Sequence, residues 1–542
     1  MRTLTRIFGI ATLAVAAAVA AAEDRTVSGT FGLGTEVSGP GADNAKYREF
    51  WFNPRSHGGS QFALTPALGL TAEPFAGTHL DLDAEGRTTP NVGDSLDGRA
   101  TLGAGRYGLW KLHADYRRIG HSFAYGAKTL YSGVGTNTLT LDDAIQYKLQ
   151  NSTSTNNAAD GLAEVMAGTA SVYTAGASEV DLGLRRDRVN VTFDWNLPAS
   201  FSAGVDLDGE HRKGTRPFGG GFGFGNAIEL PEPIDYQTLN LTARAGWMGR
   251  VPLHGGLPAY AQLSAGRSTF DDKSLGFNYD NPFRYTNTTT ASGYSANYAA
   301  GADVGRHALP PDNTADSLGV ALGTALPYHL RVDGSAHRTV NKQNVDFLPQ
   351  TTNPTMTPPD LPRKSLEGEV VKSLLTGSLS ARPLERYDVK AEYRYVQHDN
   401  RTEEFVTPQM SQLDVAQQGS ATPENVSYIE REVALEQEIE VSRRSTLGLK
   451  LTHILATFKN GSANREQENR AVLSFDTRAL DWATVRVSGE HGVRDSDYPD
   501  YSGTVYSGGE LPWMRKFYAA SRDRSQLVAM VTILPMEDLT LS

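Results

Sequence analysis

The sequence has no cysteine among its 542 residues. This absence excludes a disulfide scaffold, a thiolate metal site, an iron–sulfur cluster and a catalytic cysteine. It also excludes covalent haem, which is attached through the thiols of a C-x-x-C-H motif.

Long apolar runs are missing after the first 22 residues. No later stretch reaches the roughly 18 consecutive apolar residues that mark a transmembrane helix. The composition, with 39% hydrophobic residues and a mean hydropathy of -0.38, is too polar for a helical membrane protein. It is usual where apolar and polar residues alternate, so a membrane location would require a β-barrel.

Signatures of catalysis and of nucleic-acid binding are also scarce. There is no Gly-x-Ser-x-Gly elbow, and the 12 histidines show no His-Glu-x-x-His spacing. The net charge of -11, from 51 basic and 62 acidic residues, disfavours nucleic acid as a partner. The sequence therefore predicts no enzyme, and a hydrolase with its catalytic residues at a barrel rim is the least favoured alternative.

Three acidic residues, Asp81, Asp83 and Glu85, resemble the front half of a calcium-binding loop. Val92 stands where such a loop needs a bidentate glutamate. The acids also alternate with apolar residues, which is typical of a strand. We therefore expect a strand whose acidic side chains face a lumen.

The N-terminus is typical of an exported protein. Arg2 and Arg6 precede an apolar run over residues 7–19, and three alanines close it at positions 20–22. This pattern predicts a secretory signal peptide over residues 1–22. Residues 23–542 would then form the mature outer-membrane β-barrel.

Apolar and polar residues alternate with a period of two in several segments. Clear examples are residues 108–117, 188–197 and 388–395, where one face is apolar and the other carries charges. Strands with lipid on one face and water on the other show this pattern. Aromatic residues near the strand ends and the signal peptide favour a membrane barrel over a soluble sandwich. The polar positions supply eight candidate lumen-facing residues: Lys111, His113, Asp115, Asp194, Asp206, Lys390, Glu392 and Arg394.

Turns and loops differ in length in a regular way. Short turns, most of them with proline, are expected at residues 73–75, 197–198, 326–327, 382–384, 480–482 and 534–536. Long polar segments without periodicity lie at residues 142–179, 271–308, 341–362, 397–427 and 494–523. Short periplasmic turns and long outer loops are typical of outer-membrane barrels. The sequence thus predicts an all-β fold, a large antiparallel transmembrane β-barrel in the bacterial outer membrane with about twenty strands visible.

Four stretches carry a family resemblance. They are Asp346-Phe347-Leu348-Pro349-Gln350-Thr351-Thr352-Asn353-Pro354, Leu230-Pro231-Glu232-Pro233-Ile234-Asp235-Tyr236-Gln237-Thr238, Thr129-Leu130-Tyr131-Ser132-Gly133-Val134-Gly135, and Arg382-Pro383-Leu384 leading into Tyr393-Arg394-Tyr395 and Asp399-Asn400. Together they resemble the MtrB/PioB-type decahaem-associated outer-membrane porins, in the order found in that family. The motif residues are Pro231, Pro233, Asp235, Tyr236, Phe347, Leu348, Pro349, Asn353 and Pro354.

The resemblance implies a function. Such barrels surround a periplasmic multihaem cytochrome c, often dock an outer-surface multihaem cytochrome, and leave the electron transfer to the haems of these partners. The chain itself would bind no cofactor, because it has no haem attachment motif. A general diffusion porin or substrate channel is the alternative function.

The C-terminal segment predicts a strand that is too short to cross a bilayer. Residues 526–533 alternate, residues 534–538 repeat the turn pattern, and residues 539–542 begin the next strand. This strand has about four residues where about 9–11 are needed. We therefore expect the native chain to continue beyond Ser542 by several strands, since an unpaired edge in lipid is costly.

Overall fold

The computed structural model describes residues 27–38, 49, 61–88, 97–142, 177–222, 226–252, 256–282, 304–352, 360–408, 411–412, 415–416, 422, 425–461, 463–480, 482–498, 519–536 and 539–541. The signal peptide expected over residues 1–22 lies outside these ranges. Nearly all of the described chain is β-strand, and the one helical element within it is a short 3-10 turn, η1 (Pro198–Ser200). The all-β prediction is confirmed.

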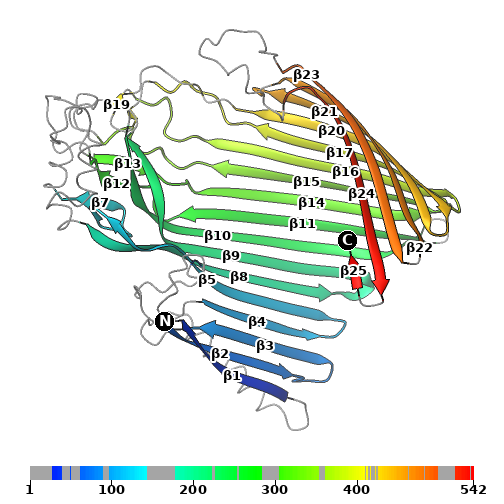
Figure 1. Cartoon of the computed structure of the whole chain (residues 1–542), viewed down its shortest axis with the longest axis horizontal. Helices are drawn as coiled ribbons and strands as arrows, with labels where there is room; N and C mark the ends of the chain where they lie inside the picture. The colour runs from blue at the N-terminus through cyan, green and yellow to red at the C-terminus, as the bar shows by residue number, and fades with distance from the viewer. Residues whose placement is uncertain are drawn as a thin grey trace.

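One sheet of 19 strands makes up most of the described chain (Figure 1). Its strands are β1 (Val27–Ser38), β2 (Gln61–Ala72), β3 (Thr78–Arg87), β4 (Asp97–Arg106), β5 (Trp110–Thr129), β8 (Ser178–Asn196), β9 (Phe201–Phe222), β10 (Asn226–Val251), β11 (Leu257–Asp272), β14 (Asn313–Leu326), β15 (Leu330–Gln343), β16 (Gly368–Leu384), β17 (Tyr387–Asn400), β20 (Ser427–Ser442), β21 (Ser445–Lys459), β22 (Arg465–Leu480), β23 (Ala483–Ser496), β24 (Arg522–Met536) and β25 (Leu539–Leu541).

The strands form an antiparallel meander, in which each strand pairs with its neighbours along the chain. For example, β5 pairs with β8, β8 with β9, and β9 with β10, without a crossover. Among the described strands, β1 pairs with β2 alone and β25 with β24 alone. The expectation that the native chain continues beyond Ser542 stays a prediction.

The short connections gather at one end of the sheet, on the right in Figure 1. They include the turns at residues 73–77, 107–109 and 327–329. Two expected turns are displaced. Residues 382–384 belong to β16, and the turn follows at residues 385–386. Residues 534–536 belong to β24. Pro383 falls within a register shift between Ala381 and Leu384, where a missing N–H is tolerated.

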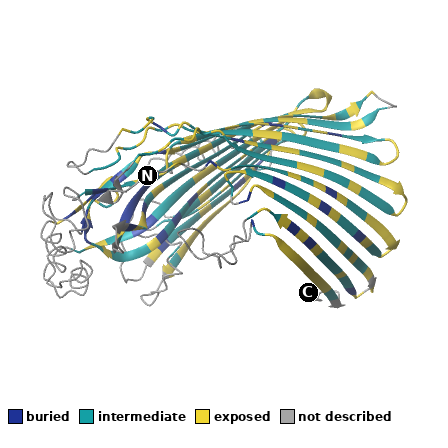
Figure 2. Ribbon diagram, turned by 90° about the horizontal axis from the view of Figure 1, so that it is seen from above, coloured by how far each residue is buried: buried dark blue, intermediate teal, exposed yellow. Residues whose placement is uncertain are grey.

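The sheet is a single curved layer (Figure 2), so its strands have two different faces rather than a common core. Val191 on β8 lies directly opposite Leu207 on β9, and Phe193 lies opposite Val205. Their neighbours in sequence point to the other face, because successive side chains alternate in a strand. One face is thus apolar along these strands and the other is polar.

Four strands extend well beyond the length that a bilayer needs. β9 has 22 residues and β10 has 26, where about 9–11 residues suffice to cross. The apolar face of β8 ends at Val189, since Asp187 is the next residue on that face. The remaining parts of β5, β8, β9 and β10 project past the apolar band at the end opposite the short turns.

A second sheet, which we term the cap, lies at this projecting end, on the left in Figure 1. It contains β6 (Tyr131–Ser132), β7 (Thr138–Leu141), β12 (Gly276–Asp280) and β13 (Val304–Ala308). β7 and β12 pair in parallel, and the other two pairings are antiparallel. The sequence interpretation of residues 271–308 as a polar loop without periodicity was therefore wrong in part. Strands of five residues are too short to show a clear period. A two-stranded ribbon, β18 (Ser411–Gln412) and β19 (Val415–Ala416), completes the described elements.

No helix among the described residues is long and apolar enough to cross a membrane.

Candidate functional site

All eight candidate lumen residues lie on the same face of the sheet. Lys111 of β5 is directly opposite Asp194 of β8. Following directly opposite residues from strand to strand leads from Asp194 to Arg244 of β10, Ser264 of β11 and finally Val396 of β17. Directly opposite residues share a face, so all of these lie on the face of Lys111. Lys390, Glu392 and Arg394 share the parity of Val396 and therefore its face. The other three candidates are His113, Asp115 and Asp206, which complete the set with Lys111, Asp194, Lys390, Glu392 and Arg394.

Arg244 is the centre of an ion-pair cluster between β8, β9 and β10. Its Nη2 donates to Oδ1 of Asp194 at 3.0 Å, and its Nε lies 3.0 Å from Oδ2 of Asp206. Thr192 also donates to Asp206 at 3.0 Å. One guanidinium thus balances two carboxylates on adjacent strands. Arg244 is not among the eight candidates, although it alternates with Leu241, Ala243 and Ala245 in the same way.

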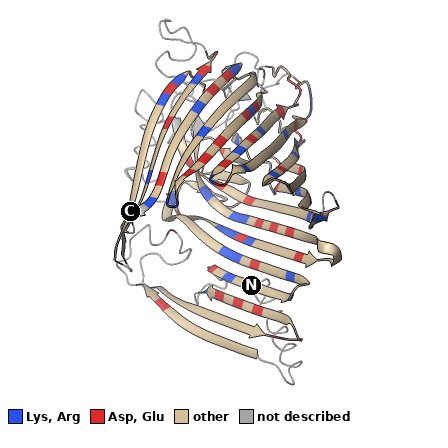
Figure 3. Ribbon diagram, turned by 90° about the vertical axis from the view of Figure 1, so that its right-hand side faces the viewer, with Lys and Arg blue, Asp and Glu red and all other residues tan. Residues whose placement is uncertain are grey.

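A second cluster joins β17 to β20 and β21. Lys390 lies 2.5 Å from Glu392 on its own strand. Arg394 reaches Oε1 of Glu430 at 3.0 Å. Lys450 of β21 lies 3.7 Å from Glu392. Figure 3 shows that basic and acidic positions are interspersed over the strands of the sheet.

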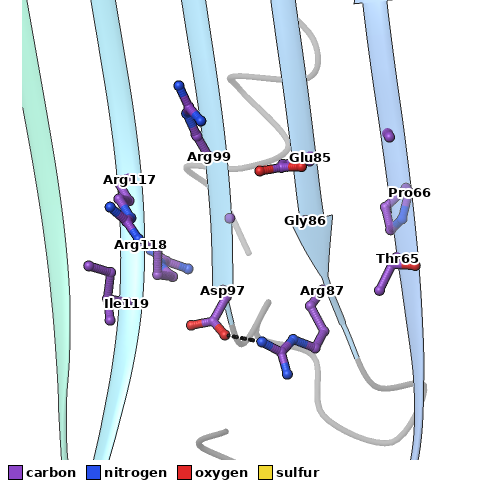
Figure 4. A pocket seen from close by; sticks show the side chains of 12 residues that line it. Thr65, Pro66, Glu85, Gly86, Arg87, Asp97, Arg99, Arg117, Arg118 and Ile119 are labelled. Atoms are coloured by element: carbon purple, nitrogen blue, oxygen red, sulfur yellow. Dashed lines mark hydrogen bonds and ion pairs between the residues drawn. The ribbon is translucent and has the colours of Figure 1, made fainter. Parts of the chain in front are cut away.

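A third cluster lies between β3, β4 and β5 (Figure 4). Arg87 and Asp97 point toward one another there, with Nη2 of Arg87 3.0 Å from Oδ2 of Asp97. Asp97 also accepts a hydrogen bond from the backbone N–H of Gly120 at 3.0 Å. On the same face, Arg99 lies 3.7 Å from Asp115. Asp115 is therefore paired, and the described part of this wall is close to charge balance.

The calcium-like pattern of Asp81, Asp83 and Glu85 forms strand β3. The strand prediction is confirmed, because all three acids belong to one continuous ladder with β4. Within the described ranges, no group of three His, Asp or Glu side chains is arranged to bind a metal ion.

The residues of the family motifs come together at the projecting end. Pro231 and Pro233 lie inside β10. The pairing of β10 with β11 begins only at Tyr236, so both prolines precede it. Before Tyr236, β10 pairs only with β9 among the described strands. The other edge of β10 makes no ladder hydrogen bonds there, so a residue without a backbone N–H is tolerated. Tyr236 packs against Phe270, with ring centroids 5.5 Å apart.

The other motif contacts the cap. A Cβ placed on Gly276 would lie 3.2 Å from Cδ1 of Leu348, so Leu348 packs closely on β12. The carbonyl oxygen of Pro349 accepts a hydrogen bond from Arg306 of β13 at 3.3 Å. Phe347 contacts Phe405, with ring centroids 6.3 Å apart. Asn353 and Pro354 lie outside the described residues.

Asp235 is held on the opposite face of the projecting strands. Oδ1 of Asp235 lies 2.7 Å from Nε2 of His211, and Oδ2 lies 3.0 Å from Nζ of Lys213. Asp235 thus pairs with residues of β9 on one face of β10. The even-numbered residues of the motif lie on the other face, where Leu230, Glu232 and Ile234 are buried.

This arrangement defines a class of protein. An antiparallel meander with an apolar outer band, a polar inner face and short turns at one end is an outer-membrane β-barrel. The chain belongs to the family of outer membrane β-barrel porins MtrB/PioB, whose family model matches residues 90–542. The family resemblance inferred from the four stretches is confirmed, as are the outer-membrane location and the fold class. The family is one of porins and not of enzymes.

Individual known proteins are also similar to the chain. The outer membrane protein MtrB of Shewanella baltica (strain OS185) is 24% identical over 452 residues, which cover 82% of this chain and 58% of that protein. The chain therefore spans a little over half the length of this relative. Among solved structures, the copper transporter OprC matches with a TM-score of 0.42 at 9% identity, over 95% of this chain and 69% of OprC. The ferric yersiniabactin receptor FyuA of Yersinia pestis matches with a TM-score of 0.43 at 10% identity, over 95% of this chain and 74% of FyuA.

Proposed function

We propose that the chain surrounds a multihaem c-type cytochrome and positions it for electron transfer across the outer membrane. The observation that supports this most is the polar inner face, which runs without interruption from β5 to β17 and carries charges of both signs. Such a wall suits the charged surface of a folded soluble protein. Barrels with more strands enclose wider lumens, and about 16–18 strands already leave an aqueous channel. The 19 strands described here are enough for a wide one.

The cofactor of this proposal belongs to the partner. A chain without cysteine cannot attach c-type haem. The contribution of the barrel is then to insulate the partner from lipid and to hold it at a fixed depth. A periplasmic multihaem cytochrome fits the lumen in this proposal, and an outer-surface multihaem cytochrome would contact the projecting end.

The decisive experiment is purification of the tagged protein in mild detergent from cells that make its natural partners. We expect a multihaem cytochrome in stoichiometric amount, visible by haem stain and by a Soret band. The band should disappear when the cytochrome is stripped from the barrel. If no haem protein accompanies the barrel and the protein conducts small solutes freely in liposomes, the general porin or substrate channel is the correct function.

A further inference from the structure

The cap lies on the lumen side of the projecting strands. Arg216 and Phe218 of β9 are separated from Asp206 by even numbers of residues, in an unbroken register with β10. They therefore share the face of Asp206 and Arg244, which is the face expected to line the lumen. Phe218 contacts His307 of the cap strand β13, with ring centroids 4.0 Å apart. The cap is thus a second layer inside the mouth of the barrel, at the end opposite the short turns.

The cap has an apolar face that is packed and a polar face that is free where it lies on β6 and β7. Tyr131, Leu139, Phe277 and Tyr279 are each at most 2% exposed, which puts them among the most buried side chains of the described chain. Thr138 and Thr140, which alternate with Leu139 in β7, are exposed. Leu230, on β10 opposite Phe218, is 0% exposed. An apolar layer between the cap and the hairpin of β9 and β10 explains this burial.

Several chain segments fasten the cap to the wall. β5 runs into β6 through Leu130 alone, and β11 runs into β12 through residues 273–275. The amide of Leu309, just after β13, donates to the carbonyl oxygen of Leu275 at 2.9 Å. These connections are too short to let the cap swing out of the mouth as a unit.

Hydrogen bonds inside the cap tie its strands to each other. The hydroxyl of Tyr131 donates to the backbone carbonyl oxygen of Asp280 at 2.9 Å. The amide of Leu141 donates to Oδ2 of Asp280 at 2.7 Å. Gly305 allows the closest approach, since a Cβ there would collide with the ring of Tyr279. The cap is therefore a folded unit with a specific core.

From this geometry we propose that the cap is a fixed partial closure of the outer mouth, which sets the largest solute that the barrel admits whether or not the lumen is occupied. Stacked sheets lie about 10 Å apart, so the cap removes about that much from the width of the mouth on the side of β9 and β10. Its free face carries the small hydroxyl side chains of Ser132, Thr138 and Thr140 on β6 and β7. At β12 and β13 the same face is contacted by Leu348 and Pro349. The part over β6 and β7 would be the outer rim of the pathway. The proposal depends on the barrel class and not on a cytochrome partner.

The test compares two neighbouring substitutions in β7. Leu139→Asp puts a charge into the packed face of the cap, and Thr140→Asp puts the same charge on its free face. The full-length protein and both variants are reconstituted into liposomes without any cytochrome, and swelling is measured with sugars from a pentose to a maltoheptaose. We expect Leu139→Asp to admit the largest sugars several-fold faster than wild type, with little change for the pentose. Thr140→Asp should behave like wild type.

A second variant keeps the outcome decisive if Leu139→Asp leaves the cap in place. In it, residues 131–141 are replaced by a Gly/Ser linker of equal length, which removes β6 and β7. Heat-modifiable mobility on gels confirms in each case that the barrel is folded. If both variants are folded and exclude large sugars as well as wild type does, the cap does not limit the mouth and the proposal is wrong. If Thr140→Asp opens the mouth as much as Leu139→Asp, the effect is one of charge, and the proposal is equally wrong.

Discussion

Arg216 of β9 forms an ion pair with Glu232 of β10, in which Nη2 of Arg216 donates to Oε1 of Glu232 at 3.1 Å. The two partners are very differently exposed, at 44% for the Arg216 side chain and 1% for Glu232. Glu232 lies under the cap, between the buried residues Leu230 and Ile234 on the same face. The pair therefore joins a buried carboxylate to a cation that still reaches water.

This asymmetry predicts unequal effects of removing the two charges. Arg216→Met leaves a buried carboxylate without its cation, and we expect local stability at the cap to fall by about 3 kcal/mol, near the lower end for a broken buried pair. Glu232→Gln leaves only a half-exposed guanidinium, which water can solvate, and should cost about 1 kcal/mol or less. Hydrogen exchange of peptides from β12 and β13 measures both. Equal loss of protection in the two variants would contradict the role given to Glu232.

The two faces of β8 should respond differently to charge. Val191→Lys puts an ammonium group into the apolar band, at a cost of about 2–4 kcal/mol near the bilayer midplane. Thr192→Lys puts the same group beside Asp206 on the polar face and should be nearly silent for folding. Urea unfolding in lipid vesicles, followed by tryptophan fluorescence, reports the difference. Similar destabilisation by Val191→Lys and Thr192→Lys would contradict the assignment of the two faces.

The absence of cysteine allows a direct test of which residues line the lumen. Single cysteines at Val189 and Asn190 are neighbours in sequence but lie on opposite faces of β8. A charged, membrane-impermeant maleimide should label Asn190→Cys readily in membranes and leave Val189→Cys unlabelled, because lipid covers the latter. Labelling of Asn190→Cys should then fall when a cytochrome occupies the lumen. Strong labelling of Val189→Cys in intact membranes would show that the apolar band ends below this residue.

Acidification should loosen the cap through His307. Burial lowers the pKa of His307 below its usual value, against a smaller opposing effect of Glu232. As the pH falls below about 6.5, the unfolded cap takes up a proton that the folded cap cannot yet bind. Stability is therefore lost progressively from that pH down to the pKa of the folded state, and then levels off.

The measurement is the rate of proteolytic cleavage within the cap between pH 7.5 and 5. His307→Phe keeps a ring between Phe218 and Phe277 but cannot be protonated. We expect it to remove the part of the pH dependence that develops just below about pH 6.5. An identical pH profile in wild type and His307→Phe would show that another group is responsible.

The period-two pattern of the sequence determined by itself the strands and their two faces. Residues 188–196 became part of β8, and the candidates on each strand fell on one face of it, because a strand turns successive side chains to opposite sides whatever it pairs with. The positions of most short turns followed from turn residues between the alternating segments, most of them prolines. Whether the eight residues line an aqueous lumen stays a prediction, which the cysteine experiment addresses.

Only the tertiary structure decided which strands of the chain meet and what their polar side chains do. Arg244 is 50 residues from Asp194, and the cluster between them exists because β9 brings β8 and β10 into one register. The cap was hidden for a related reason. Its strands are two to five residues long, lie in segments with a polar composition, and include a parallel pair between residues far apart in sequence. Local periodicity carries no information about such pairings, since their stability comes from a core that forms only when the separate segments have come together.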